Sequence, residues 1–335
     1  ASTQADLAFD LLSLEELWGR IGRPPIRGLG RTLKAMVGAL RFLRYRDGGL
    51  PLFQTANAYD DTILTALFER LPGSTPGYVI LGGYHSADCA GSRLMVDAGP
   101  FLPGGAASQM AIEFVDGVDR IISSAGGAHD LDSTLKSAIR KTAAHVGLVL
   151  AGRDTGPVGR TDPAAGAPTP SIKRIESPQD IRFEMSLETW REDLGLVWSR
   201  TLMLDRNGSR LCGVDMLAPP IADRRSAPLD ETPYQIWFPL HPSVGVTQAE
   251  ARNDASTAMP DGEICHTLAL TAGSGQVWHF ETNAPKIEIV ASVFCGGSDG
   301  VLPTRAICLQ SRFDPHKNAA HVPNRIHWQL TRPQD

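Results

Sequence analysis

The chain has 335 residues, of which 42% are hydrophobic and 21% charged, so it is long enough for two domains and has a globular rather than a disordered composition. Its formal net charge is -5 at pH 7 and no run of lysine and arginine stands out, which gives no reason to expect a nucleic-acid partner. No apolar run reaches the length of a membrane span, no signal peptide is visible, and the first residue is Ala, so we expect a processed protein or a fragment.

The first 75 residues show a helical pattern. Leu7, Leu11 and Leu14 recur at i, i+4 and i+7, as on one face of an amphipathic helix. Similar spacings predict three helices, over residues 5–20, 31–45 and 58–70. These helices could form a bundle alone, or could be the last part of a larger helical array whose open face needs a partner.

From residue 78 the pattern changes to short strands bounded by Gly, Pro, Asp or Ser. Four are predicted in succession: Tyr78–Leu81, Arg93–Asp97, Met110–Val115 and Arg120–Ser123. Asp116-Gly117 supplies a tight turn between the last two, because Gly tolerates the positive φ that a two-residue hairpin needs.

The remainder of the chain is predicted to be mostly strands. A turn or short helix over 135–145 leads into a strand over 146–151, and the Gly/Pro-rich residues 152–171 are expected to form a long loop. Further strands are predicted at Ile181–Leu187, Leu196–Leu204, Arg210–Leu217, Tyr234–Leu240, Ile264–Thr271, Gln276–Thr282, Lys286–Phe294, Ala306–Arg312 and Ile326–Leu330. We therefore expect an α+β fold, with a helical segment over 1–75 and a large antiparallel multi-sheet β-sandwich over 76–335.

Common motif-bearing enzyme classes find no support in the sequence. It contains no P-loop, G-x-G-x-x-G, H-E-x-x-H or G-x-S-x-G motif. The five cysteines are scattered without a C-x-x-C pair, which argues against a structural zinc site of the usual spacing. Buried small hydrophobes are the favoured interpretation of these cysteines over disulfides.

A few polar residues stand out as candidates for chemistry. His145 and His241 each lie at a predicted strand end, where a histidine can bind a metal or transfer a proton, although a hydrogen-bonded structural histidine is the more common case. Tyr84, His85 and the RDGGL loop over 46–50 could line a cleft, or could be solvated. Strand alternation puts Glu113 opposite Ile112 and Phe114, where a solvated carboxylate is favoured over a site residue.

Six segments in the same order resemble the C-terminal part of the heparinase II/III-like polysaccharide lyases, and are most similar to the shorter proteobacterial type. They are RDGGLPLFQTAN, GGYHSADCAGSRLMVDAGP, SQMAIEFVDGVDRIISSAG, RKTAAHVGLVL, GLVWSRTLMLDRNGSRLCGVDML and FPLHPSV. Each segment is weak evidence alone, but the colinear set is fairly specific. The resemblance implies the end of an α/α toroid followed by a β-sandwich, with a cleft for an acidic sugar between them.

The chain departs from the family pattern in two places. Substrate-facing residues of the family toroid would lie upstream of residue 1, so missing toroid helices or a partner chain would have to supply them. The run Ala106-Ala107-Ser108-Gln109, where family members carry histidines, has none. His145 matches a family histidine that ligates zinc in metal-containing members, but one histidine is too few to hold the ion, so we expect no metal cofactor.

By this resemblance the chain is a polysaccharide lyase that acts by β-elimination on a uronate-containing polymer, with weakened or lost activity. Catalysis would fall to His145, Tyr84 and His85, and substrate binding to Arg93, Glu113 and His241; the choice of Tyr84, His85 and Arg93 rests on position alone. The alternative is a non-catalytic carbohydrate-binding or envelope-assembly module, and a fragment without independent function is a third reading. The resemblance places the protein in the periplasm or cell envelope.

Overall fold

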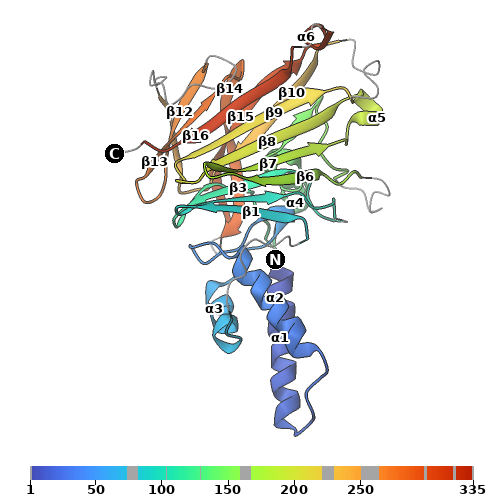
Figure 1. The fold of residues 1–335 in the computed structure, drawn as a ribbon, viewed down its shortest axis with the longest axis vertical. Helices are drawn as coiled ribbons and strands as arrows, with labels where there is room; N and C mark the ends of the chain where they lie inside the picture. The colour runs from blue at the N-terminus through green and yellow to red at the C-terminus, as the bar shows by residue number, and fades with distance from the viewer. Residues whose placement is uncertain are drawn as a thin grey trace.

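The computed structural model describes residues 2–73, 82–102, 104–128, 130–158, 167–220, 230–249, 264–297, 300–319 and 322–333. Three helices stand at one end of a larger body of β-sheets (Figure 1). Within the described residues, no helix combines the length and apolarity needed to cross a membrane.

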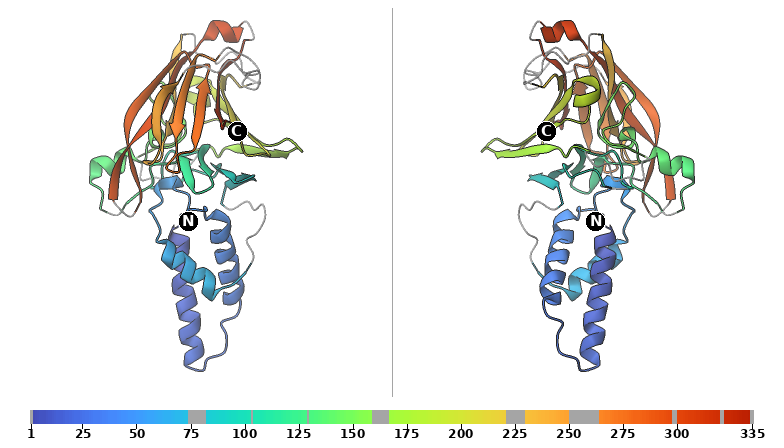
Figure 2. Two further views of the ribbon diagram at one scale, coloured as in Figure 1. Left: turned by 90° about the vertical axis from the view of Figure 1, so that its left-hand side faces the viewer. Right: turned by 90° about the vertical axis from the view of Figure 1, so that its right-hand side faces the viewer.

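The helical end consists of a hairpin of two helices and a shorter third helix. They are α1 (Ser2–Arg20), α2 (Leu29–Leu43) and α3 (Asp61–Arg70). α1 runs away from the sheets and α2 returns beside it (Figure 2). α2 buries Leu33, Val37 and Leu40, which lie on one helical face, and Asp60 caps α3 by accepting the backbone N–H of Thr62 at 2.8 Å. The three predicted helices are therefore confirmed, with ends that differ by a few residues.

The first sheet lies between the helices and the larger sheets. Its strands are β1 (Tyr84–Cys89), β2 (Ser92–Asp97), β3 (Ala111–Asp116) and β4 (Asp119–Ile122), in that spatial order. The predicted strand Tyr78–Leu81 falls outside the described residues. β1 was not predicted, because its sequence YHSADC has no apolar alternation that would mark a half-buried strand.

Both faces of this sheet are covered. Met95 and Val115 pack with the apolar residues of the helices, whereas Leu94 and Phe114 point to the other side and join the main core. Because both faces are buried, the polar residues of β2 and β3 are enclosed rather than solvated. The helical end and the sandwich meet across this sheet.

Two further sheets make up the rest of the sandwich, and their strand pairs are antiparallel. The eight-stranded sheet has the order β11-β12-β13-β16-β9-β8-β7-β6, and the four-stranded sheet β14-β15-β10-β5. The bounds are β5 (Leu148–Leu150), β6 (Ser171–Glu176), β7 (Asp180–Leu187), β8 (Val197–Asp205), β9 (Arg210–Ala218), β10 (Thr232–Pro239), β11 (Gly245–Ala249), β12 (His266–Thr271), β13 (Val277–Thr282), β14 (Lys286–Gly297), β15 (Gly300–Phe313) and β16 (Asn324–Thr331). Short helical turns occupy the connections: η1 (Phe53–Thr55), α4 (Ser133–Ala138), η2 (Thr142–Ala144), α5 (Arg191–Leu194) and α6 (Pro315–Ala319).

A buried ion pair crosses the middle of the eight-stranded sheet. The side chains of Arg200 and Asp215 are both 0% exposed, and Nε of Arg200 lies 2.7 Å from Oδ1 of Asp215. Trp198 and Trp328 donate their indole N–H groups to the same carboxylate at 2.8 and 2.9 Å, and Arg200 also donates to two backbone carbonyls. The buried charges are thus hydrogen-bonded throughout, as a buried pair must be to persist.

Candidate functional site

A crevice of about 590 Å³ opens where the helical end meets the sheets. One side comes from the loop after α2 and the start of α3, and the other from β4, the residues after β10, and β14. Its lining includes the side chains of Asp47, Tyr59, Asp60, Asp61, Arg120, His241 and Phe294. The volume falls in the range of ordinary ligand pockets.

Arg120, on β4, fixes the helical loop to the sandwich. Its Nε donates to Oδ2 of Asp47 at 2.5 Å, its Nη1 donates to the carbonyl of Leu50 at 3.2 Å, and its guanidinium stacks 4.7 Å over the ring of Tyr45. A Cβ on Gly49 would collide with Nη2 of Arg120, so the RDGGL loop needs glycine there. Arg120 is only 7% exposed, so most of its N–H groups face other protein atoms and not solvent.

Glu113 lies in the interior behind Arg120. It is 0% exposed and accepts hydrogen bonds from the hydroxyl of Tyr45 at 2.9 Å and from the backbone N–H of Leu52 at 2.9 Å. Burial raises the pKa of the Glu113 carboxyl, while the Arg120 guanidinium acts in the opposite direction. Glu113 therefore ties the helical loop to β3 and does not reach the crevice surface.

His241 lines the crevice directly. Its Nδ1 lies 2.8 Å from the hydroxyl of Ser243, and its ring meets Phe294 edge-on at 4.9 Å between centroids. Burial and the neighbouring Arg120 lower the pKa of His241 to about 4, so the ring is neutral at pH 7. A neutral imidazole can donate or accept a hydrogen bond but carries no charge for an anion.

The run without histidines is also enclosed. Ala106 and Ala107 are 0% exposed, and Ser108 donates its hydroxyl to Oδ2 of Asp97 at 2.8 Å. Gln54 of the helical loop donates to the same oxygen at 2.8 Å, and burial raises the pKa of Asp97 to about 6. These polar groups bond to each other and offer no side chain to the crevice.

His145 is completely buried away from solvent. Its Nε2 lies 3.0 Å from the carbonyl of Ile139, and burial lowers its pKa to about 4. No group of three or more His, Cys, Asp or Glu side chains in the described part of the chain is arranged to hold a metal ion. The described residues therefore place no set of metal ligands around His145.

Tyr84, His85 and Arg93 are not brought together in the crevice. In the β1–β2 register Tyr84 faces the helices, where it stacks on Phe53 at 5.6 Å and burial raises its pKa, whereas His85 faces the sandwich and packs edge-on to Phe183 at 6.2 Å. Arg93 donates to two backbone carbonyls of α2 and its C-cap, and lines a separate cavity of about 350 Å³. Of the six predicted site residues, only His241 lines the crevice.

Sequence reasoning indicated the RDGGL loop but missed its partner. Arg120 lies in a short strand between two turns and carries no pattern that marks it as an anchor. Tyr59 and Asp60 were read only as the beginning of a helix. The assignment of catalysis to His145, Tyr84 and His85 remains a prediction, although the complete burial of His145 argues against its direct contact with a polymer.

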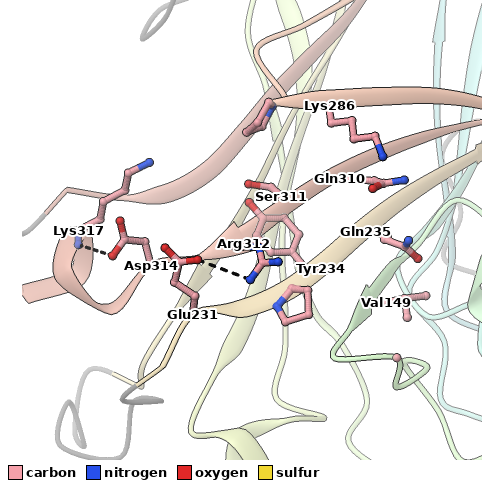
Figure 3. Close-up of a pocket in the computed structure, with 13 residues that line it drawn as sticks. Val149, Glu231, Tyr234, Gln235, Lys286, Gln310, Ser311, Arg312, Asp314 and Lys317 are labelled. Carbon is pink, nitrogen blue, oxygen red and sulfur yellow. Dashed lines mark hydrogen bonds and ion pairs between the residues drawn. The ribbon is translucent and has the colours of Figure 1, made fainter.

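A second, open groove of about 650 Å³ lies on the four-stranded sheet, away from the helices. Its row of side chains runs across β10, β15 and β14 through Gln235, Gln310 and Lys286, which are register partners (Figure 3). Arg312 pairs with Glu231 at 3.6 Å. This groove carries cations and carboxylates side by side, without burying any of them.

Comparisons with known proteins agree with this architecture. The family model described as "Heparinase II/III-like, C-terminal" matches residues 76–329. FtsZ-localized protein C of Caulobacter vibrioides is 28% identical over 354 residues, covering 98% of this chain and 56% of that protein.

Solved lyase structures share the fold at low sequence identity. The crystal structure of the heparan sulfate lyase HepC from Pedobacter heparinus has a TM-score of 0.69 at 12% identity, covering 99% of this chain and 52% of that one. The crystal structure of heparinase III has a TM-score of 0.70 at 10% identity, covering 98% and 53%. The chain thus spans about half the length of the proteins it matches. It belongs to the heparinase II/III-like family, whose C-terminal domain it carries.

Proposed function

We propose that this protein binds a polysaccharide in the crevice between helices and sandwich without cleaving it. The observation that carries the proposal is a contrast in exposure. The crevice is open and lined by Tyr59 and His241, whereas Glu113, Ser108 and His145 are buried in structural hydrogen bonds. A ring and hydrogen-bonding groups on an open surface suit the binding of sugar, which offers hydroxyls and flat apolar faces.

β-Elimination asks for more than this crevice supplies. It needs a base for the proton α to a carboxylate, an acid for the leaving oxygen, and a positive group that neutralises the carboxylate. Arg120 is the positive group at hand, yet it is 7% exposed and already pairs with Asp47. The geometry therefore favours binding over elimination.

A polysaccharide lyase acting on a uronate polymer is the second candidate. The neutral imidazole of His241 and the guanidinium of Arg120 line one crevice, and these are group types that could serve as base and carboxylate partner. The fold shared with a heparan sulfate lyase supports this candidate. The name of the Caulobacter relative, an FtsZ-localized protein, favours instead an assembly role at the cell envelope.

One pair of measurements on the purified chain separates these functions. Titration calorimetry with polysaccharide fragments should show binding that His241→Ala weakens roughly tenfold, because the variant removes a crevice hydrogen-bonding group and the ring that packs on Phe294. His316→Ala, at an exposed histidine of α6 at the far end of the sandwich, is the matched control and should bind normally (Figure 1). Ultraviolet absorbance from unsaturated uronate, lost in His241→Ala, would show that the second candidate is right and the first wrong.

A further inference from the structure

Carboxylates outnumber cations on the crevice wall. Among the described lining residues Asp47, Asp60 and Asp61 carry the acidic groups, and Arg120 is the cation. Burial alone would raise the pKa of Asp47, but the hydrogen bond and the charge of Arg120, together with the hydrogen bond from the backbone N–H of Gly49, outweigh burial, and the pKa lies below its ordinary value. Hydrogen bonds from Thr62 likewise lower the pKa of Asp60, so both carboxylates are ionised at neutral pH.

The cations near the crevice are already engaged. Arg120 is bound to Asp47 and is largely buried, and Arg44 pairs with Asp61 and also donates to Thr65 at 3.1 Å. His241 is neutral at pH 7. Asp61 is paired with Arg44, as Asp47 is with Arg120, so an incoming carboxylate or sulfate would meet the carboxylate of Asp60 before it met an unpaired positive charge among the described lining residues.

We propose, building on the binding function above, that the crevice selects glycan segments free of carboxylate and sulfate groups, with neutral or amine-bearing sugars as its ligands. Repulsion between like charges lowers the affinity for a ligand even where its shape fits the site. Hydroxyls and amines, by contrast, can donate to the carboxylates that line the wall. The ligand class would then differ from the heparan sulfate named for the structural neighbour.

The outer groove provides an internal contrast. Lys286, Arg312 and Lys317 line it together with Glu231 and Asp314 (Figure 3), and Glu288 pairs with Lys286 at 2.6 Å. Its cations therefore equal the nearby carboxylates in number, whereas carboxylates outnumber cations on the crevice wall. An anionic sugar chain that binds this protein should therefore prefer the groove on β10, β14 and β15 to the crevice. A variant that removes one charge in the crevice and another that removes one in the outer groove can show, by which of them changes the affinity, where a ligand binds.

Asp60 and Asp314 form a matched pair for this purpose. Each accepts backbone N–H groups at the start of a helix, Asp60 from Thr62 at 2.8 Å and Asp314 from His316 at 2.8 Å. Asn is as good a helix N-cap as Asp, so Asp60→Asn and Asp314→Asn remove one charge each and keep the cap oxygen. α3 and α6 lie at opposite ends of the molecule (Figure 1).

The experiment measures the affinity of the full chain for three tetrasaccharides of equal length: N-acetylated chitotetraose, its deacetylated form and tetragalacturonate. We expect the neutral and amine-bearing probes to bind roughly tenfold more tightly than the uronate at low salt, with a smaller ratio in high salt. Asp60→Asn should narrow the ratio by about threefold, because one repulsive charge is gone. Asp314→Asn should leave the affinity for the neutral probe unchanged.

The outcomes separate this inference from the function on which it rests. If tetragalacturonate binds as tightly as the neutral probe, with an affinity that Asp60→Asn does not alter, the charge selection is wrong while glycan binding stands. If none of the probes binds, or if Asp314→Asn rather than His241→Ala weakens the neutral probe, the crevice is not the binding site and the proposed function fails.

Discussion

His145 shows at the residue scale how a histidine can be structural. Its ring is 0% exposed and one nitrogen lies 3.0 Å from the carbonyl of Ile139, so the neutral form is built into the interior. Burial lowers its pKa from 6.5 to about 4. A histidine with a lowered pKa stabilises the fold above the unfolded pKa of 6.5 and loses that contribution as the pH falls through 4.

We therefore predict that His145→Gln flattens the dependence of stability on pH. Gln can still donate to the Ile139 carbonyl but does not titrate. Between pH 7 and pH 4 the wild type should lose about 3 kcal/mol more unfolding free energy than the variant, because burial lowers the pKa of His145 from 6.5 to about 4. Urea titrations at both pH values measure the difference; parallel curves for the two proteins would refute the buried neutral ring.

Glu113 shows why the sequence left the site unresolved. Strand alternation placed it correctly, opposite in direction to Phe114, but a strand pattern does not reveal whether another element covers that face. Here the loop after α2 covers it, and Tyr45 and Leu52 donate to the carboxylate. These contacts span 68 and 61 residues of sequence, so no local pattern could indicate them.

Among the structural elements, the RDGGL loop is held in place by the close contact between the backbone of Gly49 and the side chain of Arg120. Gly49 lies against the guanidinium of Arg120, which in turn is fixed to Asp47 and to the Leu50 carbonyl. Any side chain at Gly49 must displace Arg120. The loop that forms one wall of the crevice thus depends on a glycine that the sequence alone marks only as part of a turn.

Gly49→Ala should lower the unfolding free energy by about 1–3 kcal/mol, because it forces Arg120 out of its hydrogen bonds. The control is Gly38→Ala in α2, where a Cβ meets nothing within 4 Å and a better helix former should raise stability by up to about 1 kcal/mol. Denaturant unfolding of both variants gives the comparison. Equal changes in unfolding free energy for Gly49→Ala and Gly38→Ala would show that the hydrogen bonds of Arg120 do not depend on a glycine at position 49.

The buried pair in the eight-stranded sheet leads to a second prediction at this scale. Asp215→Ala leaves the guanidinium of Arg200 charged and uncompensated inside the sheet, so the unfolding free energy should fall by about 3–5 kcal/mol. Asp193→Ala removes an exposed partner of Arg153 and should cost no more than about 1 kcal/mol. Calorimetric measurement of thermal unfolding compares the two variants. If Asp215→Ala lowers the unfolding free energy as little as Asp193→Ala does, the burial of the Arg200–Asp215 pair is contradicted.

The predicted elements succeeded where apolar alternation was strong and failed at three edge strands, β1, β6 and β11, although the edge strands β4, β5 and β14 were predicted. β8 and β9 alternate regularly between buried and half-exposed residues, and Asn207-Gly208 between them is a pair typical of a tight hairpin turn. β6 and β11 are edge strands with few buried residues, and both were missed. An edge strand is fixed by backbone hydrogen bonds to its neighbour, which leave little trace in the sequence.

At the scale of the whole molecule, the helical end leaves an apolar face uncovered among the described residues. Leu7, Leu14 and Ile21 of α1 and its C-terminal turn are 51%, 44% and 60% exposed and are spaced by seven residues, which places them on one helical face. A contiguous apolar surface of this kind attracts other apolar molecules. The helical periodicity of Leu7 and Leu14 was visible in the sequence, but the exposure of these residues and the extension of the stripe to Ile21 were not.

Leu14→Lys should therefore reduce the fluorescence of a bound hydrophobic dye and any self-association of the chain, without loss of stability. Val322→Lys, at a valine between α6 and β16 that is 49% exposed, is the control and should change neither. Dye titration and analytical ultracentrifugation provide the readouts. Dye binding that is unaffected by Leu14→Lys would place the apolar surface elsewhere.

We propose that sugar binds where the helical end meets the sandwich, in the crevice lined by Tyr59 and His241. A crystal structure of the chain with N-acetylated chitotetraose tests it most directly. We predict electron density for the sugar between α3 and β4, within hydrogen-bonding distance of Asp60 or His241. Density on the outer groove of β10, β14 and β15, with an empty crevice, would contradict the account.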